Sequence, residues 1–277
     1  MLGAIIGDIV GSIYEFDNIK TKEFDFFTDE KFFTDDTVMT IAIADAIMNG
    51  GKHENFIQSM KKWGGDYIGK SYGHSFRIWL ESETSEPYNS WGNGSAMRVS
   101  PCGWVAKLDI PIEEGIKQTE ELAKISAEVT HNHPEGIKGA QATAVAIYCM
   151  RVGKAKNAVN EYKYILKSEM EKRYRYNSNF PLSQIRPTYT FNESCQGTVP
   201  QAIACFLESR NFEDAIRNAI SIGGDSDTLA AITGSIAEAA YGIPEDIKEK
   251  SMSYLDGRLK SVYENWIKFV ESLGNKI

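Results

Sequence analysis

Apolar side chains recur along this chain at spacings of three and four residues, a pattern that predicts α-helices. No run of alternating apolar and polar residues stands out, and strands do not alternate with helices, so the chain is predicted to be all-α. The segment 24–33 mixes aromatic and charged residues and is interpreted as a loop or short hairpin. Helices are expected at 36–48, 55–63, 113–127, 136–150, 198–207 (capped by Thr198, with Pro200 in the first turn), 213–222, 226–241 and 246–269.

The first thirteen residues are apolar and are expected to form a buried helix rather than a signal peptide. They have no basic start, and Asp8 interrupts the run. The segment is also too short to span a bilayer. Gly3, Gly7 and Gly11 fall on one helix face, which predicts the close approach of a second helix. Asp8 and Glu15 could then point toward a polar centre.

Composition narrows the class of protein. A net charge of -8 argues against a nucleic-acid-binding surface. Four scattered cysteines without a CxxC pair favour reduced thiols and a cytoplasmic location. Residues 154–193 are rich in Lys, Arg, Tyr and Asn, and they predict a charged surface helix followed by an ordered loop. This stretch is expected to interrupt a single domain, 1–277, rather than to separate two.

Two short acidic clusters carry the strongest chemical signal, Thr34 to Thr37 (TDDT) and Gly223 to Thr228 (GGDSDT). Each stands where a helix is expected to begin, so both could be helix N-caps. A cap needs only one such side chain, however, and each cluster supplies three or four. Brought together, they would offer the hard oxygen ligands that Mg²⁺, Mn²⁺ or Ca²⁺ prefers.

Three further segments could contribute to a site. The glycine-rich loop Trp91 to Arg98 could direct N–H groups at phosphate oxygens, or be a simple turn. The segment Thr130 to Gly136 contains His131 and His133, for which a neutral histidine bonding a ligand and a structural histidine both stay open. Ser194 to Pro200 is interpreted as a helix entry that packs the core.

In this order, the segments resemble the ADP-ribosylglycohydrolase family. The matching pieces are GAIIGDIVGSIYE (3–15), FTDDT (33–37), GNGSAMRVSP (92–101), THNHPEGIKGA (130–140), VPQA (199–202) and GGDSDT (223–228). They span most of the chain, and the two acidic segments are the specific ones. The stretch 154–193 matches no functional motif, which leaves the acceptor side of the pocket undefined.

The resemblance implies a compact orthogonal bundle of helices with two divalent cations, Mg²⁺ or Mn²⁺, in a central cleft. It also implies an ADP-ribose-bearing protein or small molecule as the partner, and no nucleic acid or membrane. The implied metal ligands are Thr34, Asp35, Asp36, Asp225, Asp227 and Thr228. The implied substrate-binding residues are Glu15, Gly92, Asn93, Gly94, Ser95, Met97, Arg98 and His131.

The chemistry implied is metal-dependent cleavage of the glycosidic bond at the anomeric carbon of ADP-ribose, with Glu15 and Asp36 as candidate bases. Two alternatives stay open: a metal-dependent phosphoesterase, and a non-catalytic protein that binds ADP-ribose or has a structural role. The residues do not identify the acceptor linkage (arginine, serine, guanidine-like or acetyl), the metal or the oligomeric state.

Overall fold

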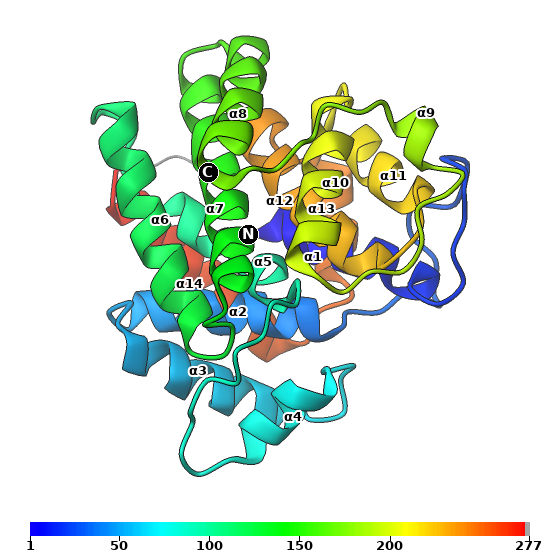
Figure 1. Cartoon of the computed structure of the whole chain (residues 1–277). Helices are drawn as coiled ribbons and strands as arrows, with labels where there is room; N and C mark the ends of the chain where they lie inside the picture. Colours follow the sequence, from blue (N-terminus) through cyan, green and yellow to red (C-terminus); the bar gives the residue numbers. More distant parts are fainter. Residues whose placement is uncertain (275–277) are drawn as a thin grey trace.

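Helices make up almost all of the regular structure in residues 1–274, the part of the chain that this computed structural model describes (Figure 1). Within that range the β-structure is a single bridge between Gly92 and Ser194. The all-α prediction is confirmed, and the segment 24–33 is a loop. Among the described helices, none combines the length and hydrophobicity needed to cross a membrane.

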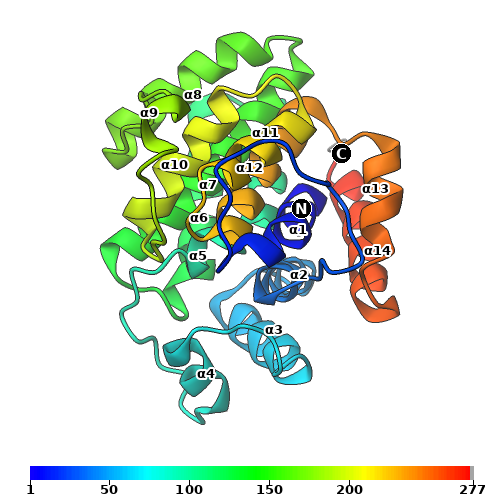
Figure 2. The same cartoon turned by 90° about the vertical axis from the view of Figure 1, so that its right-hand side faces the viewer.

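The elements follow one another along the chain, with long loops at 15–34 and 82–93. The first half contains α1 (Leu2–Gly11), η1 (Ser12–Tyr14), α2 (Asp35–Met48), α3 (His53–Asp66), α4 (His74–Glu81), α5 (Gly94–Met97), η2 (Ser100–Trp104) and α6 (Ile112–Glu128). The second half contains α7 (Pro134–Ala155), α8 (Val159–Tyr174), α9 (Leu182–Ile185), α10 (Cys195–Leu207), α11 (Phe212–Ser221), α12 (Ser226–Tyr241), α13 (Glu245–Met252) and α14 (Gly257–Ser272). Helices α3 and α4 lie at one end of the molecule and α8 at the other (Figures 1 and 2).

The buried pair α1 and α12 forms the centre of the fold, as the glycine pattern predicted. A methyl group added at Gly3 would overlap the main chain of Gly234, one at Gly7 would overlap Ala230, and one at Gly11 would overlap Asp227. The helices can approach so closely only because α1 has no side chains on this face. This contact sets the amino end of α12, and the acidic residues there, beside the carboxyl end of α1.

Gly7→Ala should therefore destabilise the protein strongly. The added methyl group collides with main-chain atoms, which cannot move aside as a flexible side chain would, so we expect a loss of about 3 kcal/mol or more. Gly65→Ala, inside α3 with open space around it, is the matched control and should be neutral or slightly stabilising. Urea denaturation of both variants measures the difference; equal stability would contradict the close-packed interface.

Some helix boundaries differ from the prediction for local reasons. The segment 246–269 is two helices, because Asp256 caps α14 by accepting hydrogen bonds from the N–H groups of Arg258 and Leu259. Helix α10 begins at Cys195 with Ser194 as its cap, so Thr198 is not the cap and Pro200 lies inside the helix rather than in its first turn. The charged helix expected after residue 154 is confirmed as α8.

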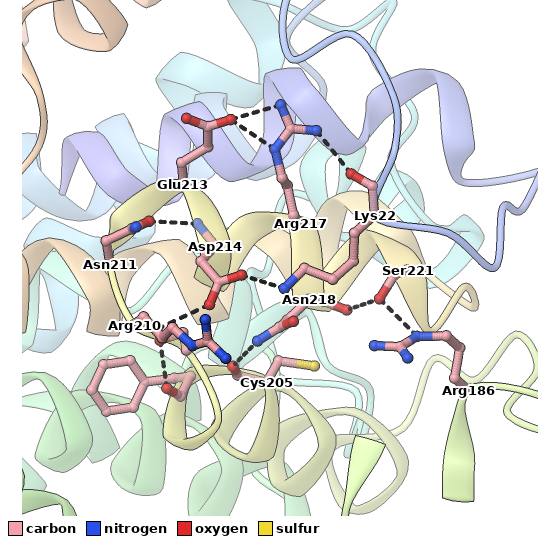
Figure 3. Close-up of polar contacts among 12 residues, drawn as sticks. Lys22, Arg186, Cys205, Arg210, Asn211, Glu213, Asp214, Arg217, Asn218 and Ser221 are labelled. Carbon is pink, nitrogen blue, oxygen red and sulfur yellow. Dashed lines mark hydrogen bonds and ion pairs between the residues drawn. The ribbon is translucent and has the colours of Figure 1, made fainter. Parts of the chain in front are cut away.

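The long loop 15–34 is fastened across α11 (Figure 3). Arg217 donates to the carbonyl oxygens of Lys22 and Phe24 at 2.9 and 2.8 Å, and Lys22 pairs with Asp214. Lys31 closes the far end by donating to the Val10 carbonyl at 2.9 Å. Since Glu15 and Thr34 stand at the two ends of this loop, these contacts help to position both.

Candidate active site

A cavity of about 390 Å³ opens where the amino ends of α2 and α12 meet the loop that leads into α5. Its lining contains six carboxylates from four separate segments. The residues that line it and were expected in the site are Glu15, Asp35, Asp36, Gly92, Asn93, Gly94, Met97, Arg98, His131, Asp225, Asp227 and Thr228. Thr34 and Ser95, also expected there, are buried and are not among the residues that line it.

The first acidic cluster is held in place by Asp8, a residue of α1. The buried Asp8 carboxylate accepts hydrogen bonds from the N–H and hydroxyl groups of both Thr34 and Thr37. Thr34 also caps α2, because its Oγ1 accepts from the N–H of Asp36 at 3.2 Å. The Thr34 hydroxyl is thus engaged on two sides, which leaves one lone pair for any ligand.

The second acidic cluster follows a turn that only glycine accommodates easily. Gly223 and Gly224 have φ of 69° and 85°. Asn18 clamps this turn: its Oδ1 accepts from the N–H of Gly224 at 2.6 Å, and its Nδ2 donates to the Gly224 carbonyl at 2.8 Å. Asp225 occupies the N-cap position of α12, but its carboxylate accepts a hydrogen bond from Asn93 Nδ2 at 2.7 Å.

The two clusters meet in one site. Thr228 Oγ1 lies 3.2 Å from Asp36 Oδ1, which joins the start of α12 to the start of α2. Carboxylate oxygens of Glu15, Asp225 and Asp227 lie within 4.8 Å of one another. Helix capping therefore explains only Thr34, because the four aspartates of the two clusters all line the cavity.

The converging carboxylates are short of positive charge. In residues 1–274 no lysine or arginine forms an ion pair with any of them. Burial, reinforced by Asp225 and Asp35, raises the pKa of Glu15 to about 8. Burial and the neighbouring Asp8 raise the pKa of Asp35 to about 7. Burial also raises the pKa values of Asp36 and Asp227 well above the usual carboxylate range.

These pKa shifts predict how pH changes the stability of the metal-free protein. A carboxyl group whose pKa is raised by folding favours the folded state while protonated, and this contribution is lost as pH rises from about 4 toward the folded pKa near 8. In EDTA, the temperature of the thermal midpoint should therefore decrease as pH is raised from 5 to 8.5. Added Mg²⁺ should raise this temperature more at pH 8.5 than at pH 5. Differential scanning fluorimetry tests this; parallel pH curves with and without Mg²⁺ would contradict it.

The wall opposite the carboxylates is formed by the loop that leads into α5. Met97, Gly92 and Gly94 line the cavity, and Gly94 is the first residue of α5 and does not have a positive φ. Ser95 is fully buried and donates to the Gly136 carbonyl at 2.7 Å, so its side chain points away from the cavity, contrary to expectation. Arg98 reaches the cavity edge while its guanidinium donates to Thr130 Oγ1 at 2.8 Å.

His131 lies against this wall as a neutral side chain. Burial, with a smaller effect of Arg98, lowers the pKa of His131 well below its usual value. Its Nδ1 is 2.7 Å from Thr130 Oγ1, and its Nε2 side faces Gly92 and Gly94. His133 instead caps α7 through Nδ1, so the two histidines have separate roles.

The pattern of the sequence indicated some of the supporting residues only weakly. Asp8 was expected near a polar centre, but not as the acceptor that organises both threonines of the first cluster. Asn18 was not singled out, because a lone asparagine in a loop is common and its partner Gly224 is 206 positions away. Ser71 and the segment Gly73 to Phe76, around the start of α4, also line the cavity without any motif to signal them.

Comparison with known proteins assigns the chain to a family. A model of the ADP-ribosylglycohydrolase family matches residues 1–273. The chain belongs to the ADP-ribosylglycohydrolase family. The resemblance inferred from the six segments, of which the two acidic motifs are the specific ones, is thus confirmed.

Several relatives of this ADP-ribosylglycohydrolase carry descriptive names. Human ADP-ribosylhydrolase ARH3 is 25% identical over 92% of this chain and 88% of its own length. The ADP-ribosyl-[dinitrogen reductase] glycohydrolase of Rhodospirillum rubrum is 25% identical over 82% of this chain and 74% of its own length. The ADP-ribosylarginine hydrolase Tri1 of Pseudomonas putida is 24% identical over 88% of this chain and 70% of its own length. A solved ADP-ribosylglycohydrolase-related protein has the same fold, with a TM-score of 0.65 over 98% of this chain and 94% of its own, at 21% identity.

Proposed function

We propose that this ADP-ribosylglycohydrolase uses divalent cations to cleave the bond between the anomeric carbon of ADP-ribose and an acceptor. The acceptor is a modified protein side chain or a small molecule. The observation that carries this proposal is the convergence of Glu15, Asp36, Asp225 and Asp227 on one cavity whose opposite wall is the loop into α5. The names of the relatives, which specify ADP-ribose, supply the substrate class.

The residues present fit hard cations such as Mg²⁺ or Mn²⁺. The donor set is made only of oxygen atoms, and burial makes its negative charge costly without a neutralising partner. Thr34, Asp35, Asp36, Asp225, Asp227 and Thr228 are the residues that would hold two such ions. When bound, the ions would neutralise the carboxylates, orient the ribose hydroxyls and make a water molecule more acidic.

The side chains around the cavity have different roles in the proposed hydrolysis. A water oxygen bonds to the anomeric carbon, the bond to the acceptor breaks, and the acceptor leaves with a proton. Glu15 is the better placed of the two candidate bases, because it is half-buried at the cavity and can exchange a proton with solvent, whereas Asp36 is enclosed. The loop Gly92 to Arg98 would bind the diphosphate side, and the neutral His131 would contact the ligand.

Product analysis tests this proposal. The protein is incubated with arginine-, serine- and acetyl-linked ADP-ribose in Mg²⁺, Mn²⁺ or EDTA, and the products are separated by chromatography. We expect free ADP-ribose from at least one linkage, and only with a divalent cation. Release of AMP or phosphate would instead indicate a phosphoesterase, and binding without any product would indicate a non-catalytic protein.

Gly94→Val should weaken ADP-ribose binding by about tenfold or more. A Cβ at this position would lie only 3.3 Å from His131 Nε2, so the branched side chain would displace the ring and fill the cavity. Calorimetric titration with ADP-ribose at fixed Mg²⁺ measures the effect, and Gly69→Val, which has open space around it, is the control. Unchanged affinity in the Gly94 variant would reassign the loop to a structural role.

A further inference from the structure

Two exposed phenylalanines, neither of which lines the cavity itself, are neighbours in sequence of its acidic residues. Phe16 is 82% exposed and Phe191 is 42% exposed, although both are large apolar side chains. Their rings stack with centroids 5.8 Å apart and planes inclined by 26°. Each is close in sequence to a carboxylate that lines the cavity, because Phe16 follows Glu15 and Phe191 precedes Glu193 by two residues.

The main chain around both rings is held firmly. Asn18 Nδ2 donates to the carbonyls of Tyr14 and Glu15, on the amino side of Phe16. On the other side, Thr198 Oγ1 donates to the carbonyl of Asn192, next to Phe191. The main chain next to each ring is therefore anchored, and the two stacked rings together present an apolar surface to solvent.

The charge around the pair indicates what it binds. Glu15 and Glu193 both line the cavity, and each is close in sequence to one of the two rings. Lys20, a cation of the same loop, donates to the carbonyls of Tyr189 and Ile222 at 2.6 and 2.5 Å, so its charge is directed at the main chain. Aromatic faces flanked by carboxylates attract a planar cation and repel a diphosphate.

We propose that Phe16 and Phe191 form an acceptor platform, which stacks on the guanidinium of an ADP-ribosylated arginine while Glu15 and Glu193 face its positive charge. This rests on the proposed function, because it assigns the acceptor side of the same cavity. The platform makes the protein selective for arginine-linked over serine-linked ADP-ribose, since a serine acceptor has neither a planar surface nor a charge.

Binding in metal-free buffer tests the platform without requiring turnover. Calorimetry compares free ADP-ribose with two peptides of matched sequence, one carrying arginine-linked and the other serine-linked ADP-ribose. The proteins are the wild type, Phe16→Ala, Phe191→Ala and Phe16→Trp. Tyr164→Ala is the control, since Tyr164 is an equally exposed aromatic residue (78%) on α8.

We expect the wild type to prefer the arginine-linked peptide. Each alanine variant should bind that peptide with an affinity about threefold to tenfold lower. Its affinities for free ADP-ribose and for the serine-linked peptide should change by less than about twofold. Phe16→Trp should retain the preference, and Tyr164→Ala should change nothing. The platform is overturned if the wild type shows no preference. It is also overturned if the alanine variants keep the wild-type affinity for the arginine-linked peptide, or lose affinity equally for that peptide and for free ADP-ribose.

A separate turnover assay keeps the two proposals distinct. Failure of the wild type to release ADP-ribose from any linkage in Mg²⁺ or Mn²⁺ would defeat the proposed function, whereas the binding comparison decides the platform by itself. Release with an arginine preference that the alanine variants do not change would defeat the platform and leave the hydrolase intact.

Discussion

Asp227→Asn should reduce release of ADP-ribose by about a hundredfold or more at subsaturating Mg²⁺. Asparagine has the size of aspartate, and its side-chain oxygen can still accept the 3.0 Å hydrogen bond from the Thr228 N–H. The substitution removes one negative charge from the convergent carboxylates, so cation affinity falls while the fold is kept. The metal-free variant should be as stable as the wild type or slightly more so, because repulsion among the carboxylates decreases.

A matched control separates loss of a ligand from loss of a helix. Asp246 occupies the same position in the first turn of α13 as Asp227 does in α12, but it is exposed and remote from the cavity. Asp246→Asn should leave activity unchanged. Initial rates over a Mg²⁺ titration, together with thermal midpoints in EDTA, give both quantities. Wild-type rates for Asp227→Asn at low Mg²⁺ would exclude Asp227 from the metal site.

Asp8→Ala should cost about 3 kcal/mol or more of folding stability and also weaken divalent-cation binding. Removing the carboxylate leaves the N–H and hydroxyl groups of Thr34 and Thr37 buried without their acceptor. The start of α2 would relax, and Asp35 and Asp36 would lose their positions. The expected signature is a lower unfolding free energy together with a higher dissociation constant for Mn²⁺.

Asp45→Ala provides the comparison for this prediction. Asp45 is a carboxylate on the same helix that accepts hydrogen bonds from Ser59 and Trp63, on the side of α2 that packs against α3. Its loss should destabilise the protein without changing Mn²⁺ affinity. Urea denaturation and Mn²⁺ titration by calorimetry distinguish the two variants. If both lose stability and neither loses Mn²⁺ affinity, Asp8 supports the fold alone.

The sequence was sufficient to predict the helical class and the meeting of the two acidic clusters. The glycines of α1 predicted a close helix contact, because three of them on one face make sense only if another helix lies against it. The surplus of carboxylates in each cluster distinguished a site from a pair of caps. Helix α12 was predicted with its observed bounds, because its apolar run is bracketed by Asp225 and Gly242.

Other features depend on contacts between distant residues and could not be derived from local pattern. Asp8 and Asn18 organise the two clusters through partners that no spacing rule identifies. The Ser95 side chain points away from the cavity because α7 packs nearby, where the Gly136 carbonyl oxygen accepts a 2.7 Å hydrogen bond from Ser95 Oγ. The break between α13 and α14 was missed because the apolar pattern continues across it, while the exposed Asp256 caps the second helix.

Anomalous diffraction from crystals soaked in Mn²⁺ would show directly whether the two clusters form one divalent-cation site. We expect anomalous peaks in the cavity within bonding distance of carboxylate oxygens of Asp36, Asp225 and Asp227, and weaker or absent peaks in Asp227→Asn crystals soaked identically. Mn²⁺ that occupies surface carboxylates in both crystals while leaving this cavity empty would contradict this expectation.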